Sequence, residues 1–61
     1  WDSKQVANWL AENGFADANA LFIQHEITGD ILLDLNYNFL RDIGVASVGE
    51  RAKILALIKK L

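Results

Sequence analysis

The chain has 61 residues and a mass of 6.8 kDa, which is room for one small hydrophobic core and one domain. It contains no cysteine and a single histidine, which excludes a disulfide framework, a thiolate zinc site and a catalytic thiol. Hydrophobic residues make up 52% and charged residues 23%, a composition typical of a folded domain. No apolar run reaches the roughly 20 residues that cross a bilayer, so we expect no membrane insertion.

The charges are distributed unevenly, although their sum is only −2. Residues 12–42 carry six acidic residues against one arginine, whereas residues 43–61 carry four basic residues against one glutamate. An acidic middle and a basic tail make the domain electrically polar, and this affects association more than it affects the fold.

The first two predicted elements are helices, because proline is absent and apolar residues recur at spacings of three and four. A helix is predicted over residues 3–13, because Asp2 or Ser3 can cap its start and Gln5 lies at capping-box distance from Asp2. Asn13-Gly14 predicts its end. Asp17 is the next candidate cap. It predicts a second helix that ends near Glu26.

Two short helices are predicted in the middle of the chain. Thr28-Gly29-Asp30 is typical of a turn and leads into a short helix over residues 30–34. Another short helix is predicted to begin after Asn36, which can act as its cap, and to end at Gly44. Three of its apolar side chains are expected to turn inward. Those three side chains are Phe39, Leu40 and Ile43.

The last predicted element is the longest helix. Ser47 and Glu50 form a second capping-box pattern, in which the serine oxygen meets the Glu50 N–H and the Glu50 carboxylate reaches back to Ser47. A broad apolar stripe then runs to the end of the chain. Lys59 and Lys60 near the C-terminal end complement the helix dipole.

Taken together, these residues resemble the sterile alpha motif (SAM) domain family over essentially all 61 positions. The residues that carry the resemblance include Trp1, Val6, Trp9-Leu10, Gly14-Phe15, Phe22, Ile27, Gly29-Asp30, Leu32-Leu33, Leu35 and Leu40. The most specific stretch is Leu-x-x-Ile-Gly-Val at 40–45, followed by Gly-x-Arg-x-Lys-Ile-Leu-x-x-Ile-x-x-Leu at 49–61. The resemblance implies an all-α fold, a compact five-helix bundle with a long C-terminal helix. It places residues 1–61 in a single domain.

The resemblance also implies a function, because SAM domains mostly bind one another. An acidic surface of one copy, the mid-loop surface, meets the end-helix surface at the start of the last helix of another copy. Carried over by position, the mid-loop surface comprises Glu26, Asp30, Asp34, Asn38 and Asp42, and the end-helix surface comprises Val48, Gly49, Arg51 and Lys53. The expected partner is another SAM domain, of its own kind or a different one. The expected setting is a larger signalling or scaffold protein.

Each of these residues also fits a purely structural role. Arg51 and Lys53 also fit the solvated face of a helix whose other side is core. Asp30 also fits a turn, and Asp42 fits an ion pair with a neighbouring base. Tyr37 fits either an exposed anchor or a half-buried packing residue, and packing is slightly favoured.

Catalysis, metal binding and a cofactor are not expected. His25, Glu26 and Asp30 lack the number and spacing of ligands that a zinc site needs. Ser3 and Ser47 both fit helix caps, and there is no second histidine to act as a partner base.

The alternative function is RNA binding, since the resemblance extends to SAM domains that bind RNA hairpins through the start of the last helix. Arg51 and Lys53 beside Glu50, in a chain of pI about 5.0, give a small electrostatic footprint for phosphate. Binding of nucleic acid is therefore the weaker hypothesis.

The expected location is intracellular, most simply the cytoplasm. The opposite charges of the two surfaces also permit a head-to-tail oligomer.

Overall fold

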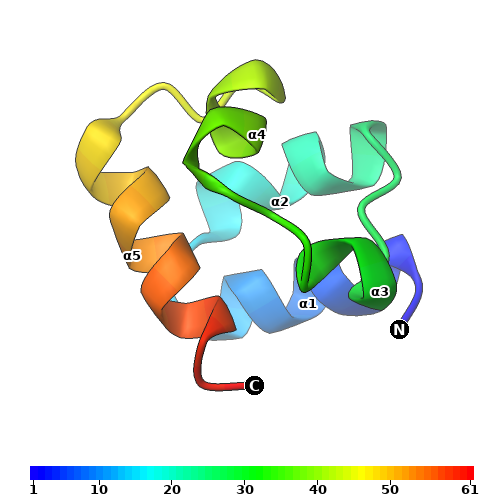
Figure 1. Cartoon of the computed structure of the whole chain (residues 1–61). Coiled ribbons are helices and arrows are strands. Elements are labelled where there is room, and N and C mark those ends of the chain that lie inside the picture. The colour runs from blue at the N-terminus through cyan, green and yellow to red at the C-terminus, as the bar shows by residue number, and fades with distance from the viewer.

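The computed structural model describes all 61 residues, and they form five helices joined by short turns (Figure 1). The helices are α1 (Ser3–Glu12), α2 (Ala16–Gln24), α3 (Gly29–Leu32), α4 (Tyr37–Asp42) and α5 (Val48–Ile58). The predicted all-α bundle is confirmed, and α5 is the longest helix, with 11 residues.

Side-chain caps begin α1 and α4 as the sequence predicts. The Asp2 carboxylate accepts a hydrogen bond from the Gln5 N–H at 2.8 Å, and the Gln5 side chain accepts one from the Asp2 N–H at 2.9 Å. This reciprocal pair is a complete capping box. At α4 the Asn36 side chain accepts a hydrogen bond from the Phe39 N–H at 2.9 Å. Both helices therefore start where a polar side chain satisfies a free backbone donor.

Three helices end in the same backbone motif, in which one residue adopts a left-handed conformation. That residue is Gly14 after α1 (φ 91°), Gly44 after α4 (φ 111°) and Glu26 after α2 (φ 54°). In each case the following N–H donates a 2.9 Å hydrogen bond to a carbonyl five residues earlier, the pattern of a Schellman motif. The predicted stops at the two glycines are confirmed. Glu26 reproduces the same geometry with a side chain that makes it less favourable.

The second and third helices start earlier than the sequence pattern predicts. Asp17 is not the cap of α2, because the helix begins at Ala16 and its N-cap, Phe15, makes no side-chain hydrogen bond. The Schellman turn at Gly14 already leads the chain directly into α2. Likewise α3 begins at Gly29, one residue before the predicted start.

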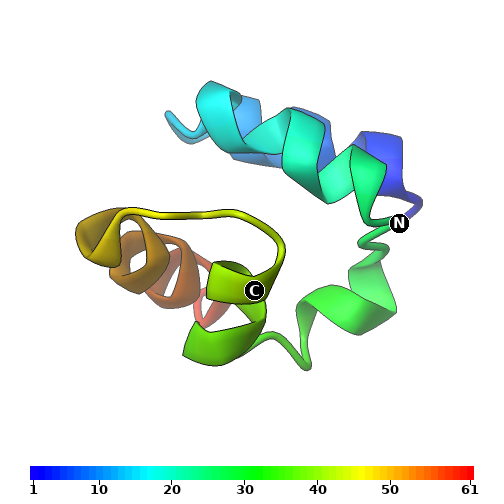
Figure 2. The same cartoon turned by 90° about the horizontal axis from the view of Figure 1, so that it is seen from above.

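The core lies between two layers of helices. Figure 2 shows α1 and α2 packed side by side as one layer, with α3, α4 and α5 forming an arc on the other side. Twelve buried apolar side chains fill the space between them: Val6, Leu10, Ala18, Phe22, Ile27, Leu32, Leu35, Leu40, Ile43, Val45, Ile54 and Ile58. Every helix contributes at least one of these side chains, so the core fixes the position of each helix relative to the others.

The predicted inward face of α4 is only partly correct. Leu40 and Ile43 are buried, but Phe39 is 48% exposed. Neighbouring residues of a helix point about 100° apart, and Leu40 is the residue of α4 that faces the core fully. With six residues, α4 has too few turns for its apolar spacing alone to define which face is buried.

Candidate functional site

The start of α5 is fixed by a side-chain cap. The Ser47 hydroxyl oxygen accepts a hydrogen bond from the Glu50 N–H at 3.3 Å, as predicted. The Glu50 carboxylate makes no return bond to Ser47, so the predicted capping box is only half formed. The remaining N–H groups of the first turn stay free to meet a polar partner.

Two residues next to this cap are open to close contact. Val48 is 62% exposed, although it is a sizeable apolar side chain. A Cβ built at Gly49 would find only the Ser47 hydroxyl oxygen within 4 Å, at 3.9 Å. An exposed valine beside bare backbone forms a small apolar surface against which another protein can pack.

Arg51 is buried, although the sequence places it in the end-helix surface or on a solvated helix face. Its side chain is 7% exposed, and its guanidinium carbon lies 4.7 Å from the centre of the Tyr37 ring. The expectation of a freely exposed base is therefore wrong, because helix geometry turns Arg51 toward α4. A charge reversal at this position would disturb packing as well as surface charge.

Lys53 is the exposed base in the first half of α5. It lines a polar pocket of about 330 Å³ between the turn that joins α1 to α2 and the start of α5. Gly14, Phe15 and Asp17 contribute the other wall of the pocket, together with Ser47, Gly49 and Glu50 on the α5 side. Sequence reasoning missed this neighbourhood, because no local pattern indicates that residues about 30 positions apart meet.

The mid-loop residues are all exposed, and they are spread from the end of α2 to the end of α4. Glu26 occupies the left-handed position after α2, and Asp30 and Asp34 belong to α3 and the turn that follows it. Asn38 and Asp42 are four residues apart on α4 and share one face of that helix. The fold thus presents the acidic residues to solvent, in three segments.

Two of the acids also have local partners. The Thr28 hydroxyl donates a hydrogen bond to the Asp30 carboxylate, and this bond, together with backbone N–H groups, lowers the pKa of Asp30 below its ordinary value of 3.8. Asp42 lies 3.6 Å from the Arg41 guanidinium, with both side chains well exposed. Such an exposed pair contributes little to stability, so it leaves Asp42 free to exchange partners.

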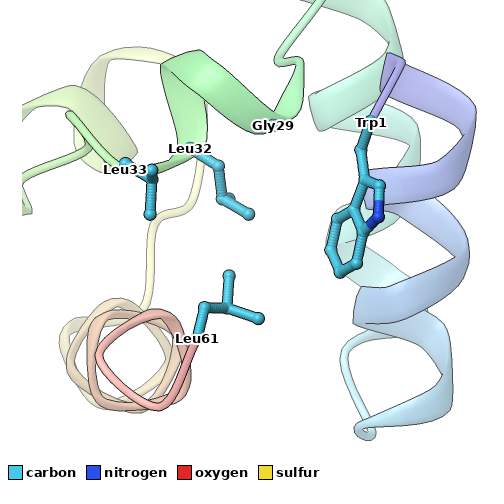
Figure 3. Close-up of a pocket in the computed structure, with 5 residues that line it drawn as sticks. All are labelled: Trp1, Gly29, Leu32, Leu33 and Leu61. Carbon is cyan, nitrogen blue, oxygen red and sulfur yellow. The ribbon is translucent and has the colours of Figure 1, made fainter.

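An apolar pocket of about 310 Å³ lies where the first and last residues approach α3 (Figure 3). Trp1, Leu32, Leu33 and Leu61 point into it from three parts of the chain, and Gly29 forms its edge. The Gly29 N–H donates a 2.8 Å hydrogen bond to the Trp1 carbonyl, which ties residue 1 to α3. No acidic, basic or nucleophilic side chain lines this pocket.

Three further features of the molecule concern metal ions, membranes and RNA. No three His, Cys, Asp or Glu residues are grouped so that they could hold a metal ion. None of the five helices is long and apolar enough to span a bilayer. The burial of Arg51 also leaves Lys53 as the one exposed base at the start of α5, which reduces the surface available to RNA phosphates.

The family of the chain follows from comparison with known proteins. The model of the SAM domain (Sterile alpha motif) family matches residues 1–61, which is the entire chain. The chain therefore belongs to the SAM family, as the sequence resemblance indicates. SAM domains generally mediate protein–protein interactions, and the chain is an interaction module of this kind.

Similar proteins are much longer than this chain. It is 36% identical to protein pob1 of Schizosaccharomyces pombe, 38% to diacylglycerol kinase delta of Mus musculus and 39% to sexual differentiation protein ste4 of S. pombe. Each match covers all 61 residues, but only 7%, 5% and 23% of the respective protein. No solved structure gives a significant match. An enzyme such as the kinase therefore carries this domain as a small part of its length.

Proposed function

We propose that this SAM domain is a non-catalytic module that binds another SAM domain, identical or different, within a larger signalling or scaffold protein. The end-helix surface of one domain meets the mid-loop surface of the next. The observation that carries the proposal is the capped start of α5, where Val48 is exposed beside the open backbone of Gly49.

The energies favour packing at Val48 over charge pairing as the main source of affinity. A micromolar complex needs about 8 kcal/mol, whereas exposed ion pairs contribute about 0.2–1 kcal/mol each. A few surface charges cannot supply that energy. Burial of an apolar side chain at the centre of a contact can supply a larger part, with charges at its edge.

Charge then determines orientation. Lys53 and the positive end of the α5 dipole both attract an acidic surface, and the mid-loop surface carries four exposed carboxylates. Because these groups are exposed, affinity should fall as salt rises. A contact between two different surfaces also leaves one of each free on every bound pair, which permits a head-to-tail chain.

The experiment that tests this function is sedimentation velocity at several protein concentrations, followed by titration against a panel of other isolated SAM domains. Mass that grows with concentration supports self-association, and saturable binding to a panel member supports a different partner. Absence of binding in both arms would overturn the proposal. A third titration with labelled hairpin RNA at near-physiological salt tests the alternative, and saturable, salt-sensitive binding there would favour it.

Charge reversal at Lys53 tests the assignment of the surface. We expect Lys53→Glu to weaken binding about tenfold or more, because it replaces attraction of the mid-loop acids by repulsion. Lys59→Glu is the matched control, since Lys59 is also exposed but lies at the far end of α5, as its C-cap. If both substitutions weaken binding equally, only net charge matters and the end-helix assignment is wrong.

A further inference from the structure

Arg51 is a buried arginine whose Nε has no hydrogen-bonded partner. It is the only polar or charged residue in the buried set, and its Nε is shielded from solvent with no acceptor nearby. No carboxylate lies within ion-pair distance, because the chain's one ion pair joins Arg41 and Asp42. A buried charge of this kind requires compensation, and the contact available to it is the face of the Tyr37 ring.

The position of Arg51 in α5 shows what this contact holds in place. The buried residues of α5 are Arg51, Ile54 and Ile58. Arg51 is thus the one buried side chain in the first half of the helix, and its contact is with the first residue of α4. The start of α5 is therefore anchored to α4 through an arginine and a tyrosine rather than through an aliphatic pair.

We propose that Tyr37 and Arg51 are positioning residues that hold the start of α5 in the orientation that partner binding requires. Arg51 acts inward, through the Tyr37 ring, and not as an ion-pair donor to the partner. This inference rests on the proposed function, and it adds a residue of α4 that belongs to neither docking surface.

The geometry explains how this pair determines the docking surface. Val48 lies one turn before Arg51 in α5, so the packing of the buried Arg51 against α4 fixes the turn that carries the exposed Val48. The face that carries Val48 is therefore set by the way Arg51 packs. Tyr37 is 38% exposed, which allows it to receive the guanidinium without being part of the core. Loss of the ring would release the first turns of α5 while Ile54 and Ile58 remain packed.

The first test is a double-substitution cycle followed by thermal unfolding, which needs no partner. We expect Tyr37→Leu to lower the melting temperature by about 4–8 °C, because it removes the aromatic face that offsets a desolvated cation. Tyr37→Phe keeps that face and should leave the melting temperature nearly unchanged. In an Arg51→Leu background the effect of Tyr37→Leu should fall to less than half. Arg51→Met, which also removes the cation and keeps a long side chain, serves as the second background if Arg51→Leu does not fold.

The second test is partner affinity as a function of salt. Tyr37→Leu should weaken binding about threefold to tenfold with an unchanged slope of log Kd against log salt, because it removes no charge. Lys53→Met, by comparison, should reduce that slope. Tyr37→Phe should bind like the unsubstituted chain, which distinguishes the ring from the hydroxyl group.

The outcomes separate this inference from the proposed function. If Tyr37→Leu changes the melting temperature equally in both backgrounds, the two side chains are not coupled and the inference is overturned. The same holds if Tyr37→Leu binds with unchanged affinity. If no SAM domain binds the unsubstituted chain, the proposed function fails. The inference then fails with it, although the unfolding cycle still shows whether the pair is coupled.

Discussion

The two proposed docking surfaces are built in different ways. The end-helix surface sits on a capped 11-residue helix and offers an exposed valine, open backbone and one exposed base. The mid-loop surface spreads over α3, α4 and the end of α2, and offers mainly exposed carboxylates. The first is suited to close packing and the second to long-range attraction, so each supplies what the other lacks.

A charge at the centre of the end-helix surface should give the largest loss of partner affinity. We expect Val48→Asp to reduce partner affinity by about 30-fold or more, because it buries a carboxylate against an acidic surface. The fold should persist, since Val48 is exposed and changes at exposed positions usually cost less than about 0.5 kcal/mol. Isothermal titration calorimetry and circular dichroism measure the two effects.

Leu61→Asp is the matched control, because Leu61 is 57% exposed but lies beyond the C-terminal end of α5. It should retain most of the affinity. Equal losses at both positions would show that general surface hydrophobicity, and not the start of α5, governs binding.

A methyl group at Gly49 should change stability and partner affinity in opposite directions. Gly49→Ala meets no clash within the chain and improves helix propensity, so the free energy of unfolding should rise by about 0.5–1 kcal/mol. Partner affinity should fall several-fold, because the methyl group prevents close approach to the backbone. Denaturant unfolding and calorimetry test the two signs. A gain in both quantities would argue against a partner packed on Gly49.

Glu26 tests whether the mid-loop surface tolerates a change that favours the fold. Glu26→Gly should raise the free energy of unfolding by up to about 1 kcal/mol, because glycine adopts the left-handed conformation without strain. Affinity should fall only about twofold, since one exposed charge of several is lost. Glu26→Gln removes the charge and keeps the strain, so its melting temperature should not rise. A destabilised Glu26→Gly variant would contradict the backbone argument.

The smallest expected effect is a pH dependence of the free energy of unfolding. It comes from Asp30, a residue of the mid-loop surface. Its pKa is lower in the folded chain than in the unfolded chain, first because of the hydrogen bond from the Thr28 hydroxyl. The ionised carboxylate therefore stabilises the fold above about pH 4, and this contribution is lost as the pH falls through the folded pKa.

Carboxyl NMR titration checks this expectation directly. Thr28→Val should move the pKa of Asp30 back toward its ordinary value. Asp30→Asn should lower the melting temperature slightly at pH 6 and not at pH 2. An Asp30 pKa that is the same with and without the Thr28 hydroxyl would refute the assigned cause.

Local signals in the sequence predict most helix boundaries. The caps at Asp2 and Asn36 and the stops at Gly14 and Gly44 depend on side chains or glycines within a few residues, so the chain itself specifies them. The left-handed Glu26 is different. No residue preference indicates it, and the fold imposes it by placing α2 and Ile27 in the core.

Side-chain direction at the candidate site is less predictable than helix position. Val48 and Lys53 are exposed, as their place in the end-helix surface predicts, but Arg51 turns inward and meets an aromatic ring from α4. Arg51 lies three and seven residues before the buried Ile54 and Ile58, so the periodicity of α5 indicates its inward direction, but the ring that it meets there depends on which helices come together. Phe39 is exposed, since Leu40 takes the inward position of a very short helix.

The shared pocket of Trp1 and Leu61 has a consequence for protein engineering. Because residues 1 and 61 lie on one side of the bundle, a short peptide that joins them can give a circularly permuted version with new ends in an exposed turn. The same arrangement favours grafting the whole bundle into a surface loop of an unrelated carrier, because both ends of the chain border one pocket.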